Sequence, residues 1–143
     1  MKNTSKKIST EEMIDFSNHF EKSIPLKFKE LYLEYNGGIP NKKYIYDYNN
    51  ENYLEIKVFL SIKYKNGSNP IIEEYISFLN KNSFNNLLPF ALDWGGNIFA
   101  IDLITERVCL LLLDLSSKII VNTITDNFSD FIDELEVEES YEE

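Results

Sequence analysis

The chain is poor in the residues that build disulfide frameworks, thiolate metal centres and histidine-dependent active sites. Its 143 residues include one cysteine, Cys109, and one histidine, His19. A single cysteine excludes an internal disulfide and a zinc site with several thiolate ligands, and it fits a reducing compartment. A nucleophile–histidine pair would have to use His19, and no motif beside it points to that chemistry. We therefore predict an inert core thiol, an ordinary surface histidine, no cofactor, no metal and no catalysis.

Long hydrophobic runs are missing as well. The longest covers residues 108–113, whereas a helix needs about 20 apolar residues to cross a bilayer. Residues 1–7 are basic, but the apolar segment of a secretory signal does not follow them. The sequence therefore predicts a cytoplasmic protein without a membrane partner.

Basic residues are missing from the end of the chain. Residues 126–143 hold nine carboxylates and no lysine or arginine, whereas residues 1–125 hold 15 acids and 14 bases, so this segment supplies most of the net charge of −10. Such a segment repels phosphate and favours a basic partner, which argues against a nucleic-acid ligand. A solvated surface with a solubilising tail is the alternative.

The hydrophobic periodicity that is present predicts one α+β domain over residues 8–137, between a flexible N-terminus (1–7) and an acidic tail (138–143). Ser9 and Glu12 form a capping box for a first helix, and Pro25 opens a second. Two further helices are expected from Pro70 and from Asp126. Alternating or continuous apolar runs predict strands at residues 43–48, 53–64, 88–92, 98–103, 108–113 and 118–122. The order ααββαββββα predicts a largely antiparallel sheet of about six strands with helices packed against it.

Four of the five glycines occur in two pairs. Asn36-Gly37-Gly38 follows the second helix, where we expect the left-handed backbone of a helix C-cap. Asp93-Trp94-Gly95-Gly96-Asn97 separates two strands, where we expect a tight hairpin turn. Gly37-Gly38 follows a helix C-terminus, where the negative end of the dipole disfavours phosphate, and Gly95-Gly96 has Asp93 beside it and no lysine. Structural turns are therefore the better interpretation.

Three motifs, in order, resemble those of the SUKH superfamily. The first runs from Pro25 to Asn36-Gly37-Gly38, the second covers residues 88–102 with its Gly-rich turn, and the third is the closing helix at 127–132. The match spans about residues 24–135. Phe16 and Phe20 stand where members often have a tryptophan and a glycine, which bears on the subgroup. The resemblance transfers only structural motif residues: Pro25, Asn36, Gly37, Gly38, Asp93, Gly95, Gly96 and Asn97.

The resemblance implies a protein-binding role. Bacterial members of the superfamily are immunity proteins encoded beside secreted polymorphic toxins, and fungal members regulate cell-wall synthesis. We expect a non-catalytic immunity protein that occludes a basic cognate toxin domain, such as a nuclease, as a monomer or weak homodimer. A regulatory scaffold like the fungal relatives is the alternative, and a small enzyme ranks last. The residues expected to contact the partner are Asp93, Trp94, Asp130, Asp133, Glu134, Glu136, Glu138 and Glu139.

Two further clusters have both a structural and a functional interpretation. Asp93, Asp102 and Asp114 fall near strand ends, where they could bind a hard cation or simply stabilise turns; turns are the favoured interpretation. The alternating tyrosines at 44, 46 and 48 could stack on bases, but the acidic charge and the single arginine favour a packed sheet face.

Overall fold

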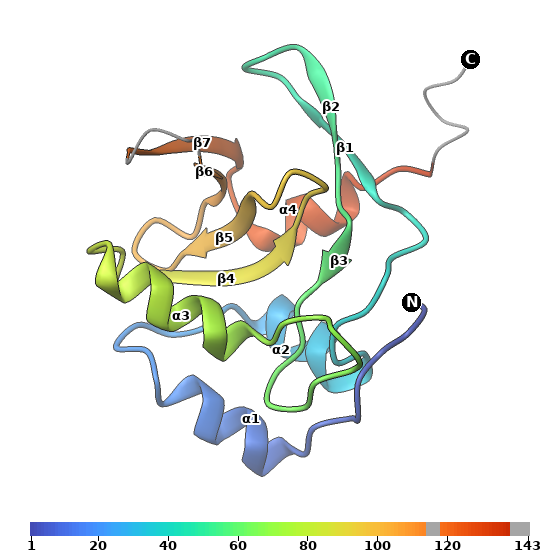
Figure 1. The fold of residues 1–143 in the computed structure, drawn as a ribbon, viewed down its shortest axis with the longest axis vertical. Coiled ribbons are helices and arrows are strands. Elements are labelled where there is room, and N and C mark those ends of the chain that lie inside the picture. The colour runs from blue at the N-terminus through green and yellow to red at the C-terminus, as the bar shows by residue number, and fades with distance from the viewer. Residues whose placement is uncertain (114–117, 138–143) are drawn as a thin grey trace.

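The computed structural model describes residues 1–113 and 118–137 (Figure 1). The chain forms four helices and seven strands within these ranges: α1 (Thr10–Ser17), α2 (Leu26–Glu34), β1 (Tyr44–Asp47), β2 (Asn52–Glu55), β3 (Val58–Phe59), α3 (Ile72–Lys81), β4 (Leu87–Leu92), β5 (Ile98–Asp102), β6 (Val108–Leu113), β7 (Ile119–Thr125) and α4 (Phe128–Asp133). The α+β class and antiparallel pairing predicted from the sequence are confirmed.

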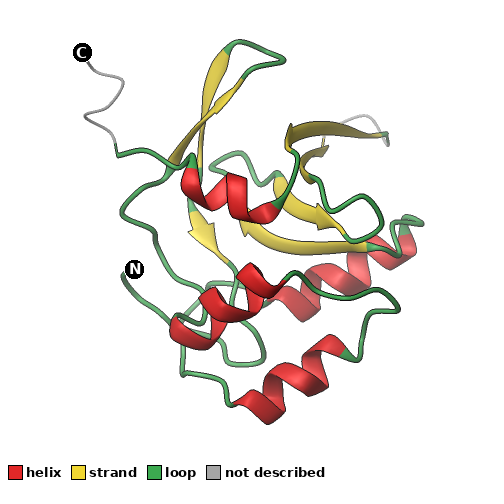
Figure 2. Cartoon of the chain, turned by 180° about the vertical axis from the view of Figure 1, so that it is seen from behind, coloured by secondary structure: helices red, strands yellow, loops and turns green. Residues whose placement is uncertain are grey.

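The strands form two sheets. Five of them make an antiparallel meander in the order β3-β4-β5-β6-β7, and β1 and β2 form a separate hairpin. The helix α3 covers one face of the meander, while α2 and α4 lie over the other (Figure 2). Because both faces are covered, β4 is buried along its whole length, from Leu87 to Leu92.

The helix starts follow local side-chain chemistry. Ser9 accepts a hydrogen bond from the Glu12 amide, and Glu12 accepts one from the Ser9 amide, so the predicted capping box is present at α1. The last helix begins one residue later than expected, because the side chain of Asn127 rather than Asp126 accepts from the Asp130 amide.

The single strand expected at residues 53–64 is two strands in different sheets. The Ile56 amide donates to the Lys43 carbonyl beside the hairpin, whereas the next amide, Lys57, donates to the Leu92 carbonyl of the meander. The alternation of apolar residues in the sequence continues through this point, but the observed burial does not follow it: residues 53–55 are half-buried and residues 58–62 are all buried. Alternation reports which face of a strand is buried and carries no information on which strand it pairs with.

Aromatic side chains fill the core between the meander and the helices α2 and α4. Phe28, Phe90, Phe99, Phe128 and Phe131 are buried and in ring contact with one another. Edge-to-face arrangements dominate, for example an 88° angle between the rings of Phe90 and Phe128. This packing fixes α4 against the sheet and thereby sets which of its side chains face solvent.

Candidate functional site

The first glycine pair supports close backbone packing. The prediction of a left-handed helix C-cap is wrong: α2 ends at Glu34, and its C-cap residue Tyr35 has an extended backbone. Gly38 then exchanges two backbone hydrogen bonds with Phe59 of β3. A Cβ atom on Gly37 would lie 2.8 Å from Ser61 Oγ and 2.9 Å from the Leu60 carbonyl oxygen. Glycine is therefore required because a strand passes directly beside it.

Asn36 fastens three chain segments together. Its side chain is fully buried; it donates to the carbonyls of Lys6 (2.8 Å) and Ile62 (2.9 Å) and accepts from the Ile62 amide (2.7 Å). Beside it, the Ser5 amide donates to the Asn36 carbonyl, and Lys2 pairs with Ile39. These hydrogen bonds give Asn36 a structural role, in which it joins residues 2–6 and the segment after β3 to the end of α2. The predicted flexibility of residues 1–7 stays a prediction.

The second glycine pair is the predicted hairpin turn, between β4 and β5. Asp93 Oδ1 accepts hydrogen bonds from the amides of Gly95 and Asn97, both at 2.8 Å, and Gly96 has φ +83°. Asn97 Oδ1 accepts from the Leu113 amide at 2.9 Å, which ties the turn to β6. The Asp93 carboxylate is thus hydrogen-bonded within the turn, and these bonds fix the backbone that carries Trp94.

Trp94, in the turn between β4 and β5, has 65% of its surface exposed. Its indole N–H donates to Glu55 Oε2 at 3.0 Å, and Lys57 Nζ lies 5.2 Å from the ring centroid. The indole borders a hollow of about 270 Å³ between β3 and the hairpin, lined also by Ile39, Lys43, Ile56, Lys57, Val58 and Asn69. An indole that is exposed and yet oriented by polar contacts is typical of an interface residue.

The helix α4 separates apolar from acidic side chains. Phe128 and Phe131 are buried, while Asp126, Asp130 and Glu134 are exposed, and we call these three carboxylates the acidic face of α4. Although Glu134 is exposed, partial desolvation of its carboxylate, followed by repulsion from Asp130 and Asp126, raises its pKa above the ordinary value. The three charges therefore act on one another as a cluster. Asp133 is also exposed, whereas Glu138 and Glu139 lie outside the described residues.

The base of the hairpin connects Trp94 to the acidic C-terminal segment. Glu55, which accepts from the indole, is the β-partner of Tyr44, and Tyr44 exchanges two backbone hydrogen bonds with Glu136, at 2.7 and 3.1 Å. The two patches expected from the sequence therefore meet through one structural element.

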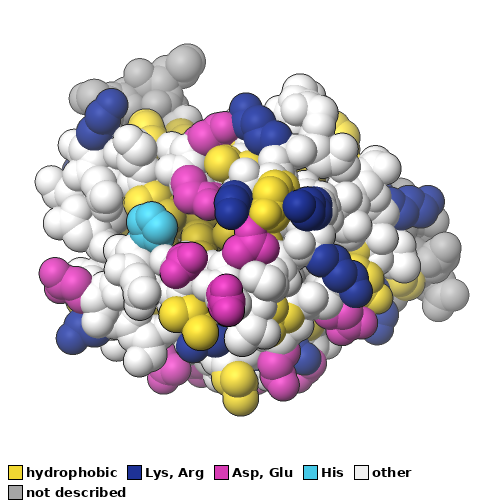
Figure 3. Space-filling model, turned by 90° about the horizontal axis from the view of Figure 1, so that it is seen from below, with side chains coloured by type: hydrophobic (Ala, Val, Ile, Leu, Met, Phe, Trp, Pro, Cys, Tyr) yellow, Lys and Arg dark blue, Asp and Glu magenta, His cyan; other side chains and the backbone are white. Residues whose placement is uncertain are grey.

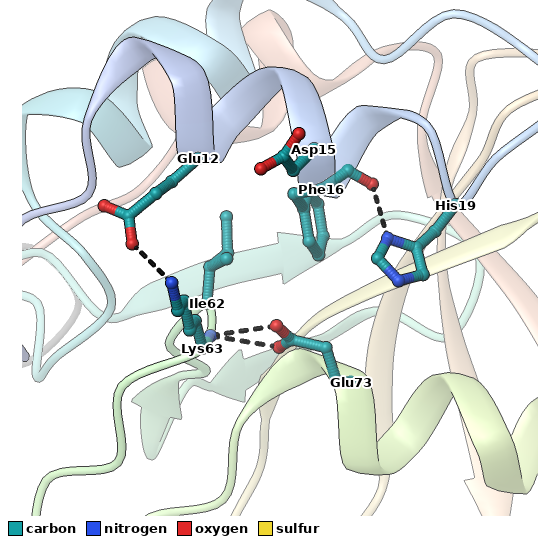
Figure 4. Close-up of a pocket in the computed structure, with 7 residues that line it drawn as sticks. All are labelled: Glu12, Asp15, Phe16, His19, Ile62, Lys63 and Glu73. Atoms are coloured by element: carbon teal, nitrogen blue, oxygen red, sulfur yellow. Dashed lines mark hydrogen bonds and ion pairs between the residues drawn. The ribbon is translucent and has the colours of Figure 1, made fainter.

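A third surface lies between α1 and the start of α3 (Figure 3). There a hollow of about 200 Å³ is lined by Glu12, Asp15, Phe16, His19, Ile62, Lys63 and Glu73 (Figure 4). Lys63 donates to Glu12 at 2.8 Å through its side chain and to Glu73 at 3.0 Å through its amide. Hydrogen bonds from Lys63, Tyr64 and the Ser9 amide lower the pKa of Glu12 to about 2. These polar groups pair mainly with one another, and through Lys63 they connect α1 to the start of α3.

Of the aspartates considered for metal binding, Asp93 and Asp102 lie at opposite ends of β5. Asp93 precedes β5 and Asp102 ends it, and Asp102 accepts from the amides of Ile104 and Thr105 in its own turn. Burial raises the pKa of the Cys109 thiol to about 12, so this thiol stays protonated. Residues 1–113 and 118–137 contain no group of three His, Cys, Asp or Glu side chains placed to hold a metal ion. Asp114 lies outside these ranges.

Sequence reasoning missed the outward tyrosine side chains of the hairpin. Tyr44 is buried, but Tyr46 is half-buried and Tyr48 is 72% exposed, so these residues do not form one packed sheet face. The alternation of tyrosine at 44, 46 and 48 was the available signal. It could not reveal exposure because a two-stranded ribbon leaves one face uncovered.

One of the comparisons with known proteins identifies a family. A family model described as the SMI1 / KNR4 family (SUKH-1) matches residues 7–134. No curated protein and no solved structure matches the chain. None of the helices in the described part of the chain is long and apolar enough to span a membrane.

Proposed function

The chain belongs to the SMI1 / KNR4 family (SUKH-1), and from this membership we propose that it is an immunity protein that binds and neutralises a bacterial polymorphic toxin domain. It acts by occlusion, without catalysis. The toxin domain presents a basic surface, such as the substrate channel of a nuclease. The acidic face of α4 is the observation that supports this partner chemistry.

The acidic face of α4 is electrostatically unfavourable for the isolated protein. Glu134 caps the C-terminus of the helix, where the macrodipole is negative, and the last turn has no basic residue. Partial burial raises the pKa of Glu134, and repulsion from its neighbours Asp130 and Asp126 raises it further. A basic partner would relieve this repulsion on binding. Binding to such a partner would therefore explain why three carboxylates lie together at this helix.

The same charges would speed association. Complementary surfaces steer diffusional encounter and can raise association rates well above the usual range at low salt. The proposed contact surface comprises Trp94, on the turn that Asp93 holds, and the acidic residues Asp130, Asp133, Glu134, Glu136, Glu138 and Glu139 of the C-terminal segment.

Co-expression with the neighbouring gene tests the proposal. The C-terminal domain encoded by that gene is expressed in bacterial cells with and without this protein, and both survival and co-purification are measured. We expect rescue and a stoichiometric complex. A domain that is not toxic, or a toxic domain from which the protein gives no protection, would contradict the proposal.

A matched pair of charge-reversal variants tests the contact surface. The double variant Asp130→Lys/Glu134→Lys removes the acidic face, and Asp15→Lys/Glu21→Lys makes the same change in net charge at exposed positions on and after α1. We expect the first to weaken binding by about 100-fold at low salt, since rim charges govern association, and the second to change it little. Equal affinities for both variants would show that the acidic face acts only in solubility.

A further inference from the structure

The β1–β2 hairpin projects from the body of the protein (Figure 1). Three tyrosines, at positions 46, 48 and 53, share one side of this hairpin and are half-buried or exposed. Tyr46 and Tyr53 are cross-strand partners, and Tyr48 follows on the same side. The ring of Tyr46 lies 4.8 Å from that of Tyr48 and 5.2 Å from that of Tyr53, with interplanar angles of 77° and 71°. We call these three residues the tyrosine face.

The hairpin is held in place from its inner side. Asp47 is 1% exposed; its carboxylate accepts from the Asn49 amide at 3.1 Å and from the side chains of Asn50 and Asn122, at 2.8 and 2.9 Å. Asn49 in turn donates to the Thr123 carbonyl of β7. These bonds fasten the tip of the ribbon to the meander, so the tyrosine face is preorganised and loses little conformational entropy when it binds.

Carboxylates lie beside the rings. The Tyr53 hydroxyl donates to Glu136 Oε1 at 3.4 Å, and Glu55 occupies the same side of β2 as Tyr53. Aromatic faces attract cations, and a guanidinium can stack on a ring while it donates a pair of hydrogen bonds to a carboxylate. The protein already uses this attraction internally, where Lys57 lies over Trp94 and Lys6 lies over Tyr64.

From these contacts we propose that the tyrosine face, with Glu136 beside it, binds arginine side chains on the surface of a protein partner. The inference rests on the proposed function in one respect, namely that this partner is the basic toxin domain. Tyrosine is favoured at such positions because it offers a large, rigid contact area with few rotatable bonds. Nucleic acid would bring phosphates toward Glu136 and Glu55, so arginine on a protein fits the charge of this surface better.

A short arginine peptide tests the recognition chemistry without the toxin. The full-length protein, with ¹³C-labelled tyrosine rings, is titrated by NMR with a heptapeptide of glycine and serine that contains two arginines. The control peptide has citrulline, a neutral isostere, in place of arginine. We expect saturable shifts of the Tyr46 and Tyr48 ring signals, with affinity about 2- to 5-fold higher for the arginine peptide, as one exposed cation–π contact implies.

Variants at the surface make the test specific. Tyr48→Ala should abolish the arginine preference and Tyr48→Phe should keep it, since the ring rather than the hydroxyl holds the cation. Tyr48 is largely exposed, so both variants should fold as the parent does. Glu136→Gln should lower the affinity severalfold. Equal shifts with both peptides, shifts confined to α4, or tighter binding of a single-stranded DNA oligonucleotide at the tyrosine rings would overturn the inference.

The toxin domain then separates this inference from the proposed function. If cells are rescued and Tyr48→Ala binds the domain as tightly as the parent, the inference is wrong while the function stands. If the protein gives no protection but its tyrosine rings still select the arginine peptide, the proposed function is wrong and the surface chemistry stands.

Discussion

Gly37 is a position at which the backbone leaves no room for a side chain. A Cβ atom there would meet two backbone carbonyl oxygens and a hydroxyl at 2.8–2.9 Å, and φ is +74°. We predict that Gly37→Ala lowers the free energy of unfolding by about 3 kcal/mol, as strain in the left-handed region adds to steric overlap. Urea denaturation measures the effect.

Gly67 provides the control for that experiment. Its φ is +64°, but a Cβ atom would meet nothing within 4 Å. Gly67→Ala should therefore cost only about 1 kcal/mol, from backbone conformation alone. Equal losses in the two variants would mean that the close approach of β3 to Gly37 does not contribute.

Glu12 gives a prediction on pH dependence. The pKa of Glu12 is about 2 in the folded protein and 4.5 ordinarily, so the ionised carboxylate stabilises the folded state. The stabilisation is complete above pH 4.5 and is lost as the pH falls toward 2. Glu12→Gln should thus reduce stability at pH 6, with a smaller difference from the parent at pH 2.5. Denaturant midpoints measure this, and Tyr64→Phe, which removes one of the hydrogen bonds to Glu12, should give an intermediate effect. A constant difference at both pH values would contradict the assignment.

Individual residue roles were only partly predictable. The Ser9–Glu12 capping box involves residues three apart, so local sequence suffices to identify it. The role of Asn36 depends on Ile62 and Lys6, which are 26 and 30 residues away. An Asn-Gly-Gly sequence after a helix fits a C-cap equally well, because the strand that packs against it does not enter a local pattern.

At the scale of elements, the sequence predicts helices and strands better than their partners. Strands β4 to β6 were expected within one or two residues of their observed bounds because each is a continuous apolar run. The switch of partner between Ile56 and Lys57 was not predictable, and it is this switch that separates the hairpin from the meander. The exposed tyrosine face is a consequence of that separation.

The helix α4 gives a prediction in which stability and binding change in opposite directions. Glu134→Lys places a cation at the C-terminus of the helix and removes repulsion from Asp130, so we expect a gain of about 0.3–1 kcal/mol in stability. The same change should weaken the complex with the basic toxin domain by about 10-fold. Thermal denaturation and titration calorimetry measure the two effects. A variant that is less stable, or one that binds as tightly as the parent, would contradict the role given to this helix.

At the scale of the whole molecule, the candidate contact surfaces are linked through the hairpin base. Trp94 reaches Glu55, and Tyr44, the partner of Glu55, reaches Glu136. The sequence identified Trp94 and the acidic segment separately, from a motif and from charge. Their connection depends on the antiparallel pairing of Tyr44 with Glu136, which joins residues 92 positions apart and leaves no signal in a local pattern.

Inhibition of the toxin domain by the purified protein tests the central claim most directly. The domain encoded by the neighbouring gene is assayed for its activity while this protein is added in increasing amounts. We predict that activity falls to background at an equimolar ratio, and that the Asp130→Lys/Glu134→Lys variant is needed at higher concentration for the same inhibition. Full activity of the domain in the presence of a large molar excess of the protein would contradict it.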